Sequence, residues 1–140
     1  MLNMLEPAAM LQSMRDELVR AGFRELRSPQ DVDSVLGPAS GKVLVFVNSV
    51  CGCAAGSARP GIAAAVQGAD PSLTLATVFA GQDRDATERA RGYFSNYPPS
   101  SPSIAILKDG VPVYHLARRQ IEGRGPDFVA AEVRAAISRI

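Results

Sequence analysis

One short stretch, residues 42–67, constrains the fold of this chain more than any other part of it. Residues 43–47 read Val-Leu-Val-Phe-Val, a continuous apolar and mostly β-branched run. Such a run is typical of a strand that is buried on both faces, as in a sheet covered by helices. Residues 54–66 follow with six alanines and favour a helix that packs closely against that sheet. The stretch therefore predicts a buried strand followed by a helix.

Both cysteines of the chain lie where this strand gives way to the helix, in the sequence Cys51-Gly52-Cys53. The first backbone N–H groups of a helix have no partner within the helix and favour negative charge. Folds that alternate strands and helices commonly place their functional sites at such junctions. We therefore predict that the two thiols form the functional site.

Length and charge limit the class of protein. The chain has 140 residues, 46% of them hydrophobic, which is enough for one core and favours a single domain. A formal net charge of +1 gives no reason to expect nucleic acid or an anionic membrane as partner. The first seven residues do not resemble a secretory signal, and no run approaches the roughly 18 apolar residues of a membrane helix. We expect a cytoplasmic protein, in which closely spaced cysteines indicate redox chemistry or metal binding.

The remaining sequence alternates between helical and strand patterns. Apolar residues at helical spacing predict a helix around residues 11–19, and Ser28 and Pro29 begin a short helix that ends near residue 36. After the cysteines we expect a strand at 73–79 with one better-covered face, followed by a helix capped by Asp83 or Asp85. A hairpin at 104–116 should turn at Asp109-Gly110, and a last helix should begin at residue 126.

From residue 42 onward the order is strand, helix, strand, helix, antiparallel hairpin and helix, which is the thioredoxin-like arrangement. The predicted fold class is α/β: a thioredoxin-like three-layer sandwich with a mixed central sheet and an extra N-terminal helix. Residues 1–140 would form one domain, with residues 1–40 as a helical extension packed on it. Pro112 cannot donate a ladder hydrogen bond, so its strand should be an edge strand or should bulge there.

The position of the thiols assigns them different roles. A thiol attacks a disulfide only as thiolate, and a helix N-terminus favours that form. Cys51 comes first after the strand and is the predicted nucleophile. Cys53 is the predicted resolving thiol, which attacks a mixed disulfide formed on Cys51. Arg59 would add positive potential, although an arginine near a helix start is more often solvated.

The spacing of the cysteines bears on the redox potential. Residues two apart on a helix point to nearly opposite sides, whereas a disulfide needs converging Cβ vectors. A bridge between Cys51 and Cys53 would thus require distorted backbone, which Gly52 would ease. Since a strained bridge is readily reduced, we expect a more oxidising couple than in a CxxC reductase.

The loop at residues 98–103 holds three prolines among serines and lies just before the hairpin. Thioredoxin-like proteins place a cis-proline against their cysteines at this point. We predict a cis Ser101–Pro102 bond, with an ordinary trans loop as the alternative. A fixed cis bond presents the backbone of the preceding residue to an incoming chain. Ser101 and Pro102 are therefore predicted substrate-binding residues, and Gly52 between the two cysteines is the third.

Other interpretations of the cysteines remain open at this point. They could be buried, inert residues. A zinc site is a second alternative, but zinc takes three or four protein ligands and His115 is the only histidine. His115 shares a strand face with Val111 and Val113 and is better explained as a packed or surface residue. An iron–sulfur centre shared between two subunits is a third alternative.

Several segments resemble one known family. Residues 48–56, Asn-Ser-Val-Cys-Gly-Cys-Ala-Ala-Gly, followed by Ala58-Arg59-Pro60, are similar to the active-site segment of the bacilliredoxins. The further matching segments are residues 21–23, 78–83, 99–103 and 121–123. The resemblance extends over almost the whole chain. It implies a thioredoxin-like thiol-disulfide oxidoreductase of the cytoplasm. We expect this protein to need no cofactor and to act as a monomer.

The resemblance also implies a substrate. Cys51 would attack mixed disulfides between oxidised client proteins and the small thiol bacillithiol, and Cys53 would then release that thiol. A weak disulfide isomerase or oxidant without small-thiol specificity is one alternative, and a non-catalytic metal or Fe–S carrier is another. Arg118, Arg119 and Arg124 could attract the carboxylates of an anionic thiol, or could form a solvated basic loop.

Overall fold

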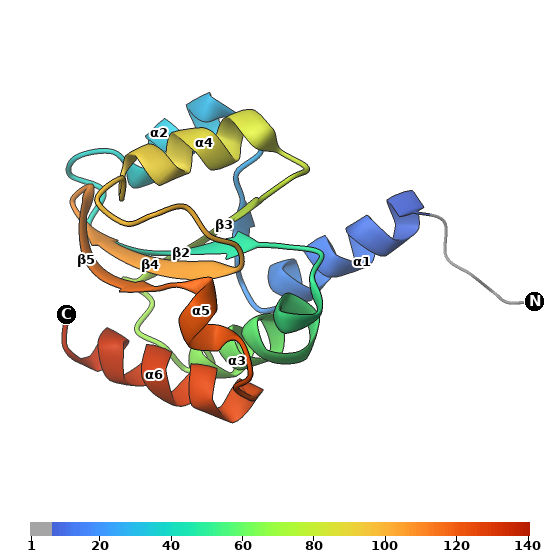
Figure 1. The fold of residues 1–140 in the computed structure, drawn as a ribbon. Coiled ribbons are helices and arrows are strands. Elements are labelled where there is room, and N and C mark those ends of the chain that lie inside the picture. The colour runs from blue at the N-terminus through green and yellow to red at the C-terminus, as the bar shows by residue number, and fades with distance from the viewer. Residues whose placement is uncertain (1–6) are drawn as a thin grey trace, which may run out of the picture.

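The computed structural model describes residues 7–140, shown in Figure 1. The expectation about a secretory signal falls mainly on residues 1–6 and lies outside the described residues. The helices are α1 (Pro7–Arg20), α2 (Pro29–Leu36), α3 (Arg59–Ala65), α4 (Arg84–Gly92), α5 (Arg118–Ile121) and α6 (Pro126–Ser138). The strands are β1 (Arg24–Glu25), β2 (Lys42–Asn48), β3 (Thr74–Phe79), β4 (Ser103–Lys108) and β5 (Val111–Leu116), and Ala54–Ala58 forms a π-helical turn before α3.

The five strands form one mixed sheet in the order β1-β3-β2-β4-β5. Strands β1 and β2 run parallel to β3, whereas β4 runs antiparallel to both β2 and β5. The predicted hairpin is confirmed, and Asp109 and Gly110 at its turn both have positive φ, as a two-residue turn that matches the strand twist requires. Pro112 lies on the edge strand β5, next to a bulge: Ile106 pairs with Tyr114 and Leu107 with Pro112, so Val113 has no partner in β4.

Helices cover both faces of the sheet and make three layers, as Figure 1 shows. Helices α1, α3 and α6 pack on one face, and α2 and α4 pack on the other. Alternate residues of β2 enter the two cores: Leu44 and Phe46 face the first, and Val43, Val45 and Val47 face the second. This division explains why the strand is apolar at every position. Among residues 7–140, no helix has the length and apolar character needed to cross a membrane.

Helices α3 and α6 approach each other closely at Gly61. A Cβ built on Gly61 would lie 2.7 Å from the Cβ of Val129 and 2.8 Å from the carbonyl oxygen of Pro126. No side chain larger than hydrogen fits there without displacing α6. The close contact fixes α3, and with it the turn that carries Cys53, against the rest of the domain.

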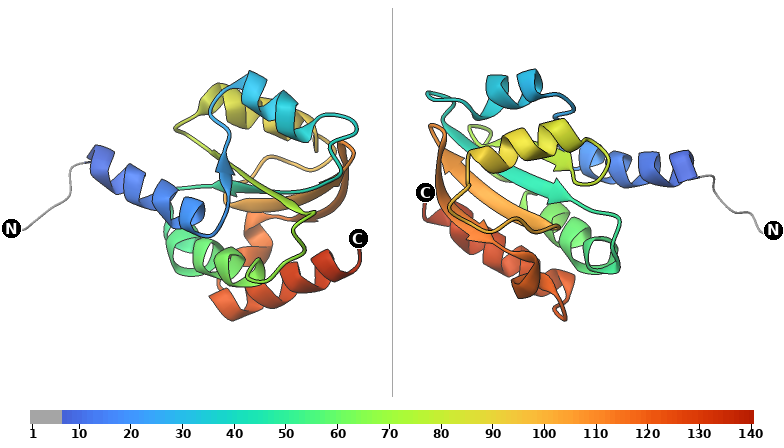
Figure 2. Two further views of the ribbon diagram at one scale, coloured as in Figure 1. Left: turned by 180° about the vertical axis from the view of Figure 1, so that it is seen from behind. Right: turned by 45° about the horizontal axis from the view of Figure 1, so that its top comes forward.

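The structure departs from the sequence-based expectations at β1, β3 and α5. The segment before Lys42 is not purely helical, because β1 pairs with β3 and is visible in Figure 2 as a short blue arrow. As a result β3 lies between two strands, and its residues from Ala76 to Phe79 are all buried instead of showing one better-covered face. The short helix α5 was not predicted either.

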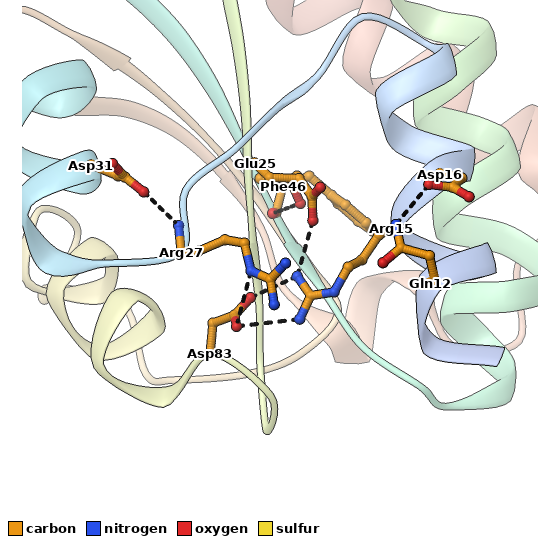
Figure 3. Close-up of polar contacts among 9 residues, drawn as sticks. Gln12, Arg15, Asp16, Glu25, Arg27, Asp31, Phe46 and Asp83 are labelled. Atoms are coloured by element: carbon orange, nitrogen blue, oxygen red, sulfur yellow. Dashed lines mark hydrogen bonds and ion pairs between the residues drawn. The ribbon is translucent and has the colours of Figure 1, made fainter. Parts of the chain in front are cut away.

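Asp83 occupies the predicted cap position of α4, but its carboxylate makes no capping hydrogen bond. Both carboxylate oxygens accept hydrogen bonds from the guanidinium of Arg15 on α1 instead, at 2.8 and 3.2 Å, as Figure 3 shows. Helical spacing assigns Arg15 to the polar side of its helix, yet Arg15 is buried. The carboxylate therefore fixes α1 to the sheet and does not cap α4.

Candidate active site

The register of the sheet brings three loop segments together around the cysteines. Val47 near the end of β2 pairs with Ser103 at the start of β4, and Ile104 of β4 pairs with Leu116 at the end of β5. The residues after β2, before β4 and after β5 consequently meet at one edge of the sheet. These are the segments that hold Cys51, Pro102 and Arg118.

Cys51 lies between β2 and the first helical turn, and both cysteines are free and partly exposed. The two Sγ atoms are 2.9 Å apart. The backbone N–H of Cys51 donates to the Ser49 hydroxyl at 3.2 Å, and the carbonyl of Cys51 accepts from the N–H groups of Ala54 and Ala55. The thiol of Cys51 therefore sits at a helix start, as predicted, with the second thiol in contact.

The pKa values of the two thiols are displaced in opposite directions. Burial alone would raise the pKa of Cys51, but hydrogen bonds from the Cys53 thiol, the Ser49 hydroxyl and nearby backbone N–H groups, including that of Ala54, lower it from 9.0 to about 7. Burial and then the hydrogen bond and negative charge of Cys51 raise the pKa of Cys53. Near neutral pH a large share of Cys51 is thiolate, while Cys53 remains protonated.

The contact between the sulfurs differs from the opposed geometry expected for two residues on one helix. Cys51 precedes the helix, so that geometry does not apply to the pair. The backbone at Gly52 is not left-handed, because Gly52 is not among the glycines with positive φ. The irregular backbone lies after Cys53, in the π-helical turn Ala54–Ala58 that leads to Pro60. A proline near a helix start lacks the N–H that would continue the α-helical ladder backward, which is consistent with the wider turn.

Arg59 is buried, with 3% of its surface exposed, and is not the solvated residue that its position near a helix start suggests. Its guanidinium donates to the Ser49 carbonyl at 2.7 Å, to Asn48 Oδ1 at 3.0 Å and to Glu17 Oε1 at 2.9 Å. Asn48 Oδ1 also accepts from the N–H of Ser49. Arg59 thus fixes the backbone that leads into Cys51.

The Ser101–Pro102 peptide bond is cis. Arg118 joins this loop to the end of β5, since its guanidinium donates to the Ser101 carbonyl at 3.3 Å and its backbone N–H donates to the Ser100 hydroxyl at 3.2 Å. Electrostatic attraction to the sulfurs of Cys53 and Cys51, in that order, raises the pKa of Arg118.

From the sequence, Arg118 was expected either to attract the carboxylates of an anionic thiol, together with Arg119 and Arg124, or to belong to a solvated basic loop, and its bond to the cis-proline loop was not predicted. The predicted hairpin contains the signal that could have found it. Two antiparallel strands of equal length bring the residue after the second strand next to the residue before the first. Arg118 follows β5 closely, and Ser101 precedes β4 closely.

His115 lies away from any group of metal ligands. Its ring stacks on Tyr97 with 4.4 Å between centroids and 7° between planes, and burial lowers its pKa. Within the described part of the chain, no three or more His, Cys, Asp or Glu side chains are grouped to hold a metal ion. The histidine is a packed residue.

The three-layer architecture and the Cys-x-Cys pair beside a cis-proline define a thiol-disulfide oxidoreductase of the thioredoxin fold. Two solved structures share this fold. Thioredoxin O2 from Arabidopsis thaliana superposes with a TM-score of 0.61 at 17% identity, covering 86% of this chain and 96% of that one. A thioredoxin from Fasciola hepatica superposes with a TM-score of 0.57 at 21% identity, covering 84% and 98%.

Sequence comparisons assign the family within that class. A family model described as disulphide isomerase matches residues 7–140. A bacilliredoxin of Symbiobacterium thermophilum is 51% identical over 90% of this chain and 89% of its own length. A bacilliredoxin of Geobacillus kaustophilus is 49% identical over 93% and 90%, respectively. The chain belongs to the bacilliredoxin family, which confirms the resemblance seen in the sequence.

Proposed function

We propose that this oxidoreductase removes bacillithiol, or a similar low-molecular-weight thiol, from mixed disulfides on oxidised cytoplasmic proteins. The contact between two thiols of unequal acidity carries the proposal: Cys51 has a pKa of about 7, and Cys53, 2.9 Å away, has a raised pKa. Such a pair supplies an attacking thiolate and a second thiol in reserve. The names of the most similar relatives support the choice of small thiol.

The first step transfers the small thiol. The Cys51 thiolate attacks the sulfur of the small thiol in the mixed disulfide, and the bond between that sulfur and the client cysteine breaks. The client cysteine leaves as a thiolate and takes up a proton. A new disulfide joins Cys51 to the small thiol, so the number of disulfide bonds is unchanged in this step.

The second step releases the small thiol. Cys53 loses its proton and attacks Cys51 Sγ, the small thiol leaves, and a Cys51–Cys53 disulfide forms. The enzyme is then oxidised by two electrons, and a thiol reductant must return both cysteines to the reduced state. The raised pKa of Cys53 keeps it protonated until Cys51 has carried out the first step.

We assign the binding of the client to Ser101, Pro102 and Gly52. Pro102 is buried and precedes the strand that pairs with β2, so Ser101 lies at the same edge of the sheet as the thiols. Gly52 is exposed, and a Cβ built on it has no atom within 4 Å, so the surface at this residue is open to an incoming chain. The adjacent Val50 is 52% exposed and offers an apolar contact.

The test presents a protein carrying a bacillithiol adduct to the reduced enzyme and follows the adduct by mass spectrometry. Cys51→Ser should leave the client modified. Cys53→Ser should remove the adduct from the client and retain it on Cys51, because the resolving thiol is missing. Equal activity of the two variants would contradict the assigned roles.

A second candidate function is that of a disulfide isomerase or oxidant without preference for a small thiol. The description of the matching family model, disulphide isomerase, favours it. Refolding of a protein with scrambled disulfides, measured beside adduct removal, separates the two activities. The oxidising couple was expected from opposed Cβ vectors, a geometry that does not apply to this pair, whose Sγ atoms are 2.9 Å apart. The reduction potential tests that expectation, and a value near that of thioredoxin, about −270 mV, would contradict it.

A further inference from the structure

A groove with a volume of about 550 Å³ opens beside the cis-proline loop. It is lined by the loop before β4, with Tyr97, Pro99 and Ser100, and by the end of β5 and α5, with His115, Arg118 and Arg119. Sites for small molecules in proteins are commonly about 300–1,000 Å³. The groove is therefore large enough for a small organic molecule.

Arg118 connects this groove to the thiols. It lines the groove and donates to the carbonyl of Ser101, and the register of the sheet places both Ser101 and Arg118 at the edge that carries Cys51. A molecule whose sulfur is bonded to Cys51 can thus extend past Arg118 into the groove. The groove lies next to the place where the small thiol is held after the first step of the proposed reaction.

The lining of the groove combines aromatic rings with positive charge. The rings belong to Tyr97 and His115, which stack on each other. Arg118 and Arg119 supply the charge, and Glu122 neutralises part of it through an ion pair with Arg118 at 3.2 Å. Among residues 7–140, no carboxylate forms an ion pair with Arg119. One cation of the groove is available to a ligand.

We propose that this groove binds the carboxylate-bearing part of a low-molecular-weight thiol, with Arg119 and Arg118 as its anion-binding residues. The proposal rests on the proposed function and adds the substrate subsite to it. Guanidinium groups suit carboxylates because their planar donors match the two oxygens. Arg124 of the same basic loop has a different surrounding, since its guanidinium lies over the ring of Phe128 at 4.4 Å and does not line the groove.

Binding without reaction tests the groove directly. S-methyl bacillithiol cannot exchange disulfides, and its titration into the full-length protein can be followed by NMR. Arg119→Gln should weaken binding about five- to tenfold, the loss expected for one charge-assisted hydrogen bond in a partly solvated site. Arg124→Gln removes the same charge from the same loop and should leave binding within about twofold. Equal weakening in both variants would show a general charge effect and overturn the assignment.

Adduct removal provides the second readout. One client peptide carries either bacillithiol or cysteamine, which has no carboxylate. Arg119→Gln should slow removal of bacillithiol about five- to tenfold more than removal of cysteamine. An equal slowing of both adducts would show that the groove holds the client peptide instead. If the wild-type protein binds S-methyl bacillithiol but removes no adduct, the proposed function is wrong and the assignment of the groove is retained. If it removes adducts without binding S-methyl bacillithiol, only the assignment of the groove is wrong.

Discussion

Two buried arginines, Arg15 and Arg59, both join α1 to the rest of the molecule but have different surroundings. Arg15 lies between two carboxylates, Asp83 at 2.8 Å and Glu25 at 3.0 Å, and its guanidinium packs over the ring of Phe79, 5.0 Å from the ring centroid. Figure 3 shows Arg15 with its two carboxylate partners. Arg59 has one carboxylate partner, Glu17, and its remaining bonds go to the neutral oxygens of Asn48 and Ser49.

The difference separates support of the fold from support of the site. The partners of Arg15 belong to β1 and to the segment before α4, so its ion pairs fix α1 to the edge of the sheet. Arg59 holds the two residues that end β2 and lead into Cys51. A buried charge that is bonded to neutral backbone oxygen contributes to the position of that backbone. We therefore expect Arg59, but not Arg15, to affect the reactivity of the Cys51 thiol.

The largest expected effects come from matched substitutions of the two arginines. Arg59→Met and Arg15→Met each remove a buried guanidinium and should each lower the free energy of unfolding by about 3 kcal/mol, measured by urea denaturation. Arg59→Met should in addition raise the pKa of Cys51, because the Ser49 hydroxyl that lowers it is no longer held in place. Arg15→Met should leave that pKa unchanged.

The pKa of Cys51 can be followed by the pH dependence of its alkylation in the Cys53→Ser background, with the arginine substitutions compared against that background alone. This measurement reports on the site at a pH and temperature where all variants are folded. An equal rise in both arginine variants would show that loss of stability, and not the position of Ser49, changes the thiol. The distinction between the two regions would then be wrong.

A smaller effect is expected when a partner of Arg15 is changed. Asp83→Asn removes the charge but keeps one oxygen that can accept from Arg15, and Glu25 remains 3.0 Å from the guanidinium. We expect a loss of about 1–2 kcal/mol in the free energy of unfolding and no change in the rate of adduct removal. Thermal and urea unfolding measure the first quantity. A slower transfer reaction in a folded Asp83→Asn protein would link the Arg15 cluster to the site.

Sequence patterns predicted the parts of the fold that depend on neighbours in the chain. The apolar run of β2, the Asp109-Gly110 turn and the place of Cys51 at a strand end all follow from a few consecutive residues. The cis bond at Pro102 was predicted from the type of fold. These features are sufficient to assign the thioredoxin fold and the thiols of the site.

The features that the sequence did not reveal depend on partners far away in the chain. Arg15 is buried because Asp83, 68 residues later, neutralises it, and Arg59 is buried because Glu17, 42 residues earlier, does so. A pattern of neighbouring residues does not show pairs that are so far apart in the chain. A charged residue on a helix is therefore predicted to face solvent. Strand β1 has two residues, too few to show alternation. Gly61 is unfavourable for a helix in the sequence, and only the close contact between α3 and α6 explains why a glycine occupies this position.

The smallest expected effect tests whether Arg59 acts through Ser49. The rate of adduct removal should rise with pH through about 7, since the thiolate of Cys51 forms as pH exceeds its pKa, and should level off above it. Ser49→Ala removes one hydrogen bond to the thiolate and should shift this midpoint to higher pH, with a loss of stability below about 1 kcal/mol. Ser49→Ala should therefore raise the pKa of Cys51 as Arg59→Met does, but without the loss of stability. Adding Arg59→Met to Ser49→Ala should shift the midpoint no further. An additional shift in the double variant would mean that the charge of Arg59 acts on the thiolate directly.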